Sequence, residues 1–148
     1  MPIQQMSCAW PLLVTAHQQR FVHIWDLENA FKTNNFQPTE VIEATLKFPL
    51  TALSCFSDGK GFCLGSIEGR CQVKNYDTKT HEKGASKDFC FKCHRKEDAQ
   101  TKSATVWAVN GFCFNKKYNT FASYGGDGTY TTWNKDTKSK YRSSETFP

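Results

Sequence analysis

One local pattern, a strand followed by a tight turn and a second strand, occurs three times along the chain. The copies are Leu12–Asp26, Gly61–Lys74 and Thr120–Asn134, with turns at Gln19-Arg20, Glu68-Gly69-Arg70 and Asp127-Gly128. Their strands are rich in Val, Thr, Phe, Tyr and Trp, whereas apolar positions at helical spacing are almost absent. When the copies are aligned on their turns, Trp25, Lys74 and Trp133 become equivalent. Such a repeat predicts an all-β chain built from stacked units.

Each unit has room for four strands. Candidates for the first and last strand are Leu50–Phe56 and Phe89–Cys93 in the second copy, and Val106–Phe114 and residues 140–146 in the third. Four antiparallel strands form the blade of a β-propeller. We therefore expect a partial WD-repeat β-propeller of about three four-stranded antiparallel blades, spanning residues 1–46, 50–93 and 94–146 of one domain over 1–148.

Two polar stretches, Asn29–Pro38 and Lys79–Lys87, are expected to be enlarged loops. They would explain why the spacing of the copies exceeds the roughly 40 to 45 residues of a typical WD repeat. Propellers usually close with at least about four blades. Three copies therefore predict that the chain holds only part of a propeller.

The third copy contains four side chains that could form a buried hydrogen-bond relay: His94, Ser123, Asp127 and Trp133. In WD-repeat blades Asp holds His, His reaches the hydroxyl and the hydroxyl meets the indole N–H, so each buried polar group has a partner. The functional alternative is a Ser-His-Asp hydrolase triad. Because Ser123 lies in no Gly-x-Ser-x-Gly elbow, we expect a structural relay, no catalytic residue and no enzyme. The other copies keep only Thr15 with Trp25, and Ser66 with Glu68.

Residues Cys90–His94 read CFKCH, which matches the CxxCH attachment signature of c-type haem. A zinc site on Cys90, Cys93 and His94 would need a second half-site that the sequence lacks. The segment Phe89–Cys93 alternates like a strand, which separates Cys90 from Phe91 on opposite faces. We therefore expect no cofactor and no metal, and a thiol- and histidine-based metal or haem protein remains the alternative from a different class.

The first residues give no sign of a membrane span or a secretory signal. The uncharged stretch up to Gln19 is broken by polar side chains, and Met1–Met6 has no basic residue. The chain has seven cysteines, an odd number that a closed disulfide framework would leave unpaired. We expect reduced cysteines, an intracellular protein and no membrane partner.

The basic excess lies in the second half of the chain, which has twelve Lys or Arg against seven Asp or Glu, whereas residues 1–80 have seven of each. Two basic groups stand out: Lys135, Lys138, Lys140 and Arg142 after Trp133, and Lys92, Arg95 and Lys96 around the preceding strand. If both lie near one rim, they could bind an acidic peptide or nucleic-acid phosphates. The alternative is a lysine-rich edge that only blocks strand association.

Several segments closely resemble the Rae/Gle family of nuclear mRNA-export WD-repeat propellers. They are Gly61–Arg70, Phe91–Arg95, Ala108–Gly111 and Asp127–Asp136, with the strings GSIEGR and FKCHR as the most specific. The resemblance runs from Ile3 to Thr146 and covers about three of the family's seven blades. Asn134 stands where the family usually has Asp, Lys138 where Arg is usual, and Cys90 where Thr is more usual, so the CxxCH string looks accidental.

The resemblance implies a non-enzymatic adaptor with no small-molecule substrate. It implies binding of a GLEBS-type nucleoporin motif and of single-stranded RNA, and a nuclear and nuclear-pore location with shuttling to the cytoplasm. Carried over to this chain, the partner-binding residues would be Phe91, Trp133, Asn134, Lys135, Lys138 and Lys140. Within this class, a mitotic spindle-checkpoint adaptor is the alternative.

Overall fold

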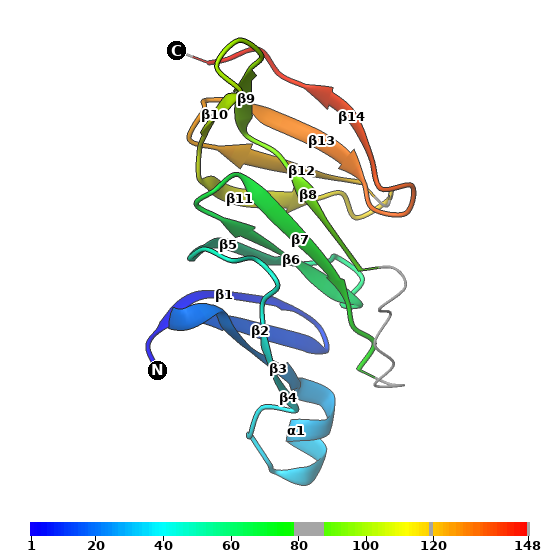
Figure 1. Cartoon of the computed structure of the whole chain (residues 1–148). Helices are drawn as coiled ribbons and strands as arrows, with labels where there is room; N and C mark the ends of the chain where they lie inside the picture. Colours follow the sequence, from blue (N-terminus) through cyan, green and yellow to red (C-terminus); the bar gives the residue numbers. More distant parts are fainter. Residues whose placement is uncertain (79–87, 119, 148) are drawn as a thin grey trace.

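The computed structural model describes residues 1–78, 88–118 and 120–147. Three four-stranded antiparallel sheets follow one another along the chain, each with its strands in sequence order (Figure 1). The first holds β1 (Ile3–Ala9), β2 (Leu12–His17), β3 (Phe21–Asp26) and β4 (Glu40–Glu43). The second holds β5 (Leu50–Cys55), β6 (Gly61–Ser66), β7 (Arg70–Asn75) and β8 (Phe89–Lys92). The third holds β11 (Val109–Phe114), β12 (Thr120–Gly125), β13 (Tyr130–Asn134) and β14 (Ser139–Ser143).

The all-β blade architecture predicted from the repeat is confirmed, and we call the sheets blades 1, 2 and 3. Three smaller elements complete the described structure: the two-stranded hairpin of β9 (Arg95–Asp98) and β10 (Ser103–Val106), the short 3-10 helix η1 (Gln18–Arg20) and the helix α1 (Leu27–Thr33). The first strand of blade 2, β5, lies beside β1 of blade 1 and β11 of blade 3. The blades therefore stack side by side with their first strands adjacent.

The prediction of a loop over Asn29–Pro38 was partly wrong, because α1 (Leu27–Thr33) occupies its beginning. The Asp26 carboxylate accepts a hydrogen bond from the Asn29 N–H at 3.1 Å and caps the helix. Lys32 and Glu28 form an ion pair one turn apart, and Asn34 ends the helix in the left-handed conformation with φ of 52°. The other predicted loop, 79–87, lies outside the described residues.

The predicted strand Val106–Phe114 is two strands in the structure. Val106 ends β10, and β11 begins only at Val109. Between them the Trp107 N–H donates to the His94 carbonyl, and the Ala108 carbonyl accepts from the Gly126 N–H. The chain turns here because these backbone groups bond outside a common ladder. No helix in the described parts of the chain has the length and apolar character that a membrane crossing requires.

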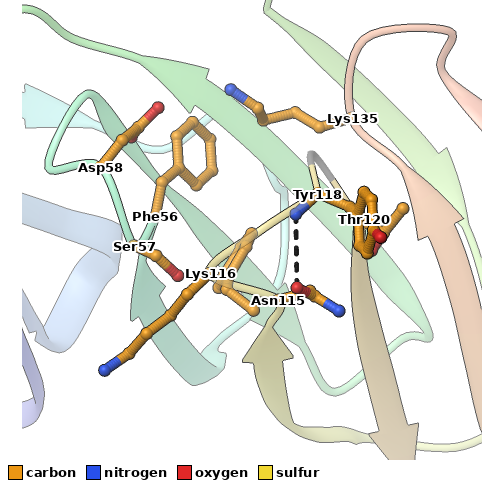
Figure 2. A pocket seen from close by; sticks show the side chains of 9 residues that line it. Phe56, Ser57, Asp58, Asn115, Lys116, Tyr118, Thr120 and Lys135 are labelled. Atoms are coloured by element: carbon orange, nitrogen blue, oxygen red, sulfur yellow. Dashed lines mark hydrogen bonds between the residues drawn. The ribbon is translucent and has the colours of Figure 1, made fainter.

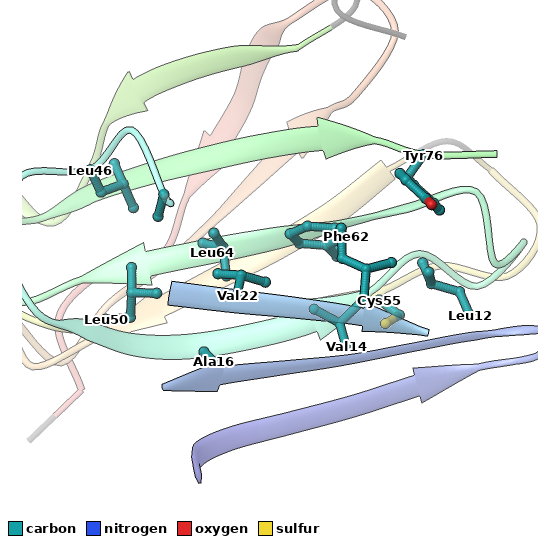
Figure 3. Close-up of a cluster of buried hydrophobic side chains, with 12 residues drawn as sticks. Leu12, Val14, Ala16, Val22, Leu46, Leu50, Cys55, Phe62, Leu64 and Tyr76 are labelled. Atoms are coloured by element: carbon teal, nitrogen blue, oxygen red, sulfur yellow. The ribbon is translucent and has the colours of Figure 1, made fainter. Parts of the chain in front are cut away.

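Apolar side chains fill the two boundaries between blades. The cluster between blades 1 and 2, drawn in Figure 3, contains Leu12, Val14, Ala16, Val22, Ile24, Ala44, Leu46, Leu50, Cys55, Phe62, Leu64 and Tyr76. Alternation along each strand sends the intervening residues to the opposite face. In β6, Phe62 and Leu64 thus face blade 1, while Cys63 packs with Phe121 of blade 3. Each boundary is a small core closed by two sheets.

Blades 2 and 3 approach each other closely at Gly65. A Cβ atom built on this residue would lie 2.7 Å from the Cβ of Val109 and 3.2 Å from the Cβ of Ala52. The Thr51 hydroxyl donates to the Val109 carbonyl at 2.6 Å across the same boundary. Gly65 therefore permits the two sheets to approach closely at the start of β11.

We expect Gly65→Ala to destabilise the chain by about 1–3 kcal/mol, because the added methyl group overlaps the Val109 side chain. The cost should be smaller in a Val109→Ala background, where the overlap with Val109 Cγ1 is removed and only that with its Cβ stays, so the two substitutions should couple in a double-mutant cycle. Urea unfolding measures both effects. Gly126→Ala is the matched control, since its nearest neighbour would be 3.7 Å away. Strictly additive costs at Gly65 and Val109 would contradict this packing.

Candidate functional site

His94, Ser123, Asp127 and Trp133 form one chain of hydrogen bonds at the boundary of blades 2 and 3. The His94 ring places Nδ1 2.9 Å from the Asp127 carboxylate and Nε2 3.0 Å from the Ser123 hydroxyl. The Trp133 Nε1–H donates to the same hydroxyl at 3.0 Å. His94 and Ser123 are both buried. The four side chains come from the segment after β8, from β12, from the β12–β13 turn and from β13.

The carboxylate of Asp127 determines which atoms donate and which accept in this series of hydrogen bonds. The Thr129 backbone N–H donates to it at 3.1 Å and the Thr129 hydroxyl at 2.9 Å. Burial tends to raise the pKa of Asp127, but the hydrogen bonds from Thr129 and His94 outweigh burial and lower this pKa below its ordinary value. An ionised Asp127 can only accept, so Nδ1–H of His94 donates to it, and in the neutral ring Nε2 then accepts from Ser123. Sequence reasoning missed Thr129, although the Asp-Gly-Thr spacing is typical of an Asx turn.

This arrangement does not offer a nucleophile to a substrate. The Ser123 side chain is fully buried, and its oxygen already accepts from Trp133 while its proton goes to His94. A hydrolase serine must reach a carbonyl carbon with a free oxygen lone pair. The geometry therefore fits a structural relay.

The equivalent residues of the other blades have different partners. In blade 1, Thr15 Oγ1 lies 2.8 Å from His17 Nε2, and the Trp25 indole N–H donates to the Phe36 carbonyl at 3.3 Å. In blade 2, the Ser66 hydroxyl reaches only the Arg70 carbonyl, at 3.4 Å. Among the described residues, the complete relay is confined to blade 3.

The CxxCH string does not assemble a metal or haem site. Cys90 is exposed and its Sγ lies 3.3 Å from Thr45 Oγ1, whereas Cys93 is buried with its Sγ 3.3 Å from that of Cys71. Both nitrogens of His94 are engaged in the relay. Burial raises the pKa of the Cys71 thiol, which disfavours the thiolate that a metal requires. Residues 1–78, 88–118 and 120–147 contain no group of three His, Cys, Asp or Glu placed to hold a metal ion.

Phe91 and Trp133, the two predicted aromatic partner-binding residues, contact each other across the boundary of blades 2 and 3. Their ring centroids are 4.3 Å apart, both side chains are half-buried, and both pack against the boundary core. They therefore form one joined aromatic contact rather than two walls of an open pocket. Lys140 lies opposite Trp133 in the β13–β14 register and is exposed.

The lysines after β13 lie against aromatic rings of blade 2. Lys135 Nζ is 4.5 Å from the centroid of the Phe56 ring, and Lys138 Nζ is 5.3 Å from that of Phe89. Both distances are within the range of a cation–π interaction. Sequence reasoning missed Phe56 and Phe89 as neighbours of these lysines, although Phe89 shares a strand face with Phe91 by alternation.

Asn134 faces away from this surface. It follows Trp133 in β13, so alternation turns its side chain to the other side of the sheet. Its Nδ2 donates to the Tyr141 hydroxyl at 2.9 Å, and its Oδ1 accepts from the N–H groups of Asp136 and Thr137. Asn134 thus shapes the β13–β14 turn that carries Lys135, and it is not part of the contact between Phe91 and Trp133.

The two basic groups of the second half do not share one rim. Lys138 lies against Phe89 at the start of β8, whereas Lys92 ends that strand. The Arg95 guanidinium, two residues after β8, donates to the Glu68 carbonyl at 3.0 Å. The groups therefore lie toward opposite ends of β8, and the expectation of one joined basic rim was wrong.

Consecutive four-stranded blades with an Asp–His–Ser–Trp relay define a WD-repeat β-propeller protein, and solved structures agree. A chain of a mitotic checkpoint complex matches 97% of this chain with a TM-score of 0.69 at 17% identity, and this chain spans 38% of it. Sqt1 from Chaetomium thermophilum matches 96% with a TM-score of 0.72 at 12% identity, and 35% of it is covered. No family model matches the chain.

Sequence relatives within this class are mRNA export proteins. The Poly(A)+ RNA export protein of Schizosaccharomyces pombe is 36% identical over 144 residues, which is 95% of this chain and 37% of the relative. The mRNA export factor rae-1 of Caenorhabditis elegans is 36% identical over 146 residues, 94% of this chain and 36% of the relative. Over this region the chain is similar in sequence to mRNA export factors of the Rae/Gle type. It spans little more than a third of the length of these relatives.

We expect Ser123→Ala to lower the free energy of unfolding by about 1–3 kcal/mol, because it leaves buried groups of His94 and Trp133 without a partner. The matched control is Ser66→Ala in blade 2, where the lost bond is long and joins no relay. Urea unfolding of both variants measures the difference. Equal costs for the two serines would contradict a special role of the blade 3 relay.

The contribution of Asp127 to stability should depend on pH. Its folded pKa lies below the ordinary value of 3.8, so folding favours the carboxylate. The stabilisation is complete above that value and is lost as the pH falls through the folded pKa. The difference in unfolding free energy between the parent chain and Asp127→Asn should therefore shrink below pH about 4. Urea unfolding from neutral to acidic pH tests this, and a difference that does not change with pH would contradict it.

Proposed function

We propose that this chain is part of a non-enzymatic adaptor in nuclear mRNA export. The observation that carries the proposal is its 34–36% identity, over 88–95% of the chain, to proteins named as mRNA or poly(A)+ RNA export factors. The proposed protein partner is a GLEBS-type nucleoporin motif. The proposed location is the nucleus and the nuclear pore, with shuttling to the cytoplasm.

The proposed binding surface comprises Phe91, Trp133, Asn134, Lys135, Lys138 and Lys140. The aromatic pair Phe91 and Trp133 is partly exposed, since both side chains are half-buried. The exposed Lys138 and Lys140 lie on the adjoining turn and strand, where cations mainly raise the association rate and the salt dependence of binding. Asn134 supports the surface indirectly by holding the turn. A GLEBS-type peptide would thus meet an aromatic contact with lysines beside it.

Single-stranded RNA is the proposed nucleic-acid ligand. Tyr141 and Tyr118 are exposed, and Lys117 Nζ lies 5.4 Å from the Tyr118 centroid. Exposed rings next to cations are typical of sequence-tolerant binding of single strands. Labelled oligo(U) binding at several salt concentrations tests this ligand.

A mitotic-checkpoint adaptor is the second candidate. It is favoured by 33% identity over 146 residues, 99% of this chain, to the mitotic checkpoint protein BUB3.1 of Arabidopsis thaliana. Depletion in cells separates the two roles. Retention of poly(A)+ RNA in the nucleus supports the export role, whereas failure to arrest with unattached chromosomes, with normal RNA export, supports the checkpoint role.

We expect the double variant Lys138→Glu and Lys140→Glu to weaken binding of a GLEBS-type peptide at least about tenfold at low salt, with a smaller effect at high salt, because screening removes the charge term. Isothermal titration at two salt concentrations measures this. The control is Lys96→Glu with Lys102→Glu on the β9–β10 hairpin, which changes the net charge equally. Equal loss in both double variants would contradict the surface. These lysines are cleaner probes than Phe91, whose truncation would also open the boundary core next to Trp133.

A further inference from the structure

Two buried sulfur atoms face each other at the boundary between blades 2 and 3. The Sγ atoms of Cys71 and Cys93 are 3.3 Å apart, and both residues belong to the boundary cluster that contains Ala52 and Val109. Cys71 lies near the start of β7, and Cys93 follows the last residue of β8. Both are free thiols in this structure. Neither thiol belongs to the relay or to the proposed partner surface.

The pairing of β7 with β8 brings the two cysteines together. Cys71 lies opposite Phe91 in the register, and alternation places Cys93, two residues further on, on the same face of the sheet as Phe91. The Cys93 backbone N–H donates to the Gly69 carbonyl at 2.9 Å, so the hydrogen bonding between the two segments continues past the end of β8. Cys71 and Cys93 are thus diagonal neighbours on one face of the sheet.

The backbone around the pair is held in place from two sides. Gly69, in the β6–β7 turn, has a φ of 64°, and a Cβ atom built on it would lie 2.4 Å from the Cys93 carbonyl oxygen. This turn therefore packs directly on the segment that carries Cys93. The next residue, His94, is hydrogen-bonded to blade 3 through the relay. The two sulfurs are thus kept within the distance of about 3–3.5 Å that favours reaction between two positioned groups.

The contact is short enough for a disulfide to form. An S–S bond is about 2.0 Å long, so the two sulfurs need to close by little more than about 1 Å, which small rotations of the two side chains provide. We propose that Cys71 and Cys93 are a redox pair, which a peroxide converts into a disulfide between β7 and the segment after β8. This site is independent of the proposed function, because it involves only these two thiols.

The two thiols differ in access, and this difference sets the order of the steps. Cys93 is 6% exposed, whereas Cys71 is fully buried. Burial raises the pKa of the Cys71 thiol well above its ordinary value, which makes Cys71 a poor first nucleophile. The Cys93 thiolate therefore attacks one oxygen of hydrogen peroxide. The O–O bond breaks, hydroxide leaves and takes up the proton that the Cys93 thiol gave up, and Cys93 becomes a sulfenic acid.

The second step joins the two sulfurs. The Cys71 sulfur attacks the sulfenic sulfur of Cys93, the S–O bond breaks, and the hydroxyl group leaves as water with the proton of the Cys71 thiol. The two cysteines together lose two electrons and two protons, and hydrogen peroxide is reduced to two molecules of water. A small thiol reverses the reaction by thiol–disulfide exchange.

The disulfide fixes the connection between blades 2 and 3. It ties Cys93, the residue before the relay histidine His94, covalently to β7. It also closes a loop between two residues that are 22 positions apart in the sequence. A cross-link of this kind restricts the unfolded chain. The oxidised chain should therefore unfold at a higher urea concentration than the reduced chain.

The test treats the folded 148-residue chain with hydrogen peroxide, blocks the remaining thiols and digests the chain with trypsin without reduction. Cleavage after Lys and Arg places Cys71 in the peptide 71–74, Cys93 in the peptide 93–95 and the exposed Cys90 in the separate peptide 88–92. Mass spectrometry should find 71–74 joined to 93–95 as the main disulfide, and dithiothreitol should remove it. A main disulfide that involves Cys90, or a free Cys71 thiol after Cys90 has been oxidised, would overturn the proposal.

The matched control for urea unfolding is Cys63→Ala. Cys63 is as buried as Cys71, but it belongs to the neighbouring cluster with Phe56, whose ring lies beside Lys135 in Figure 2. Peroxide should raise the urea midpoint of the parent chain and of Cys63→Ala, and dithiothreitol should reverse the rise.

Cys71→Ala should show no such rise, with circular dichroism to confirm that this variant is folded. An equal rise in Cys71→Ala would assign the effect to other cysteines and would refute the redox pair. If Cys71→Ala does not fold, the joined peptides decide alone: their presence in the parent chain and in Cys63→Ala supports the pair, and their absence overturns it.

Discussion

Every other feature of this structure depends on the packing of one sheet face against the next. A four-stranded sheet of this size has two faces to cover, and each boundary here is closed by alternating apolar side chains from two blades. Phe62 and Cys63 are neighbours in β6, yet they belong to different boundary cores. The blades are therefore not independent units, and a substitution at one boundary alters the packing of both sheets that form it.

The relay places polar chemistry inside this apolar boundary. His94 leaves the last strand of blade 2 with a φ of 46°, a left-handed conformation that is uncommon for a residue other than glycine. In this conformation the imidazole ring of His94 is hydrogen-bonded to Asp127 and Ser123 of blade 3. The segment that connects two blades is thus fixed to the second of them. Removing a relay member would leave a buried polar group without its hydrogen bond. It would also detach the connecting segment from blade 3.

The same packing separates two surfaces with different chemistry. At one end of the boundary lie the relay and the Arg95 contact to Glu68. Around the β13–β14 turn, Lys135 and Lys138 extend over Phe56 and Phe89 of the neighbouring blade. A lysine over an aromatic ring is less mobile than one in solvent. These lysines thus hold the β13–β14 turn against blade 2.

The sequence by itself determined most strands of the blades, the order of the blades and the identities of the relay residues. Its signals are local, because alternation along Gly61–Ser66 and turn residues such as Asp127-Gly128 specify a strand and a turn without reference to the rest of the chain. Local signals also explain the errors. The helix Leu27–Thr33 depends on capping interactions at both ends, and these cannot be recognised within a uniformly polar stretch of sequence. The break after Val106 depends on backbone hydrogen bonds to His94 and Gly126.

Only the tertiary structure decided which side chains meet across a boundary. Phe91 and Trp133 became one contact, Asn134 faced the opposite side of its sheet, and Phe56 joined Lys135 although 78 positions of sequence separate them. Distances of this kind depend on how far each blade is rotated and shifted on its neighbour, and that is set by the fit of whole apolar faces, which no single strand encodes.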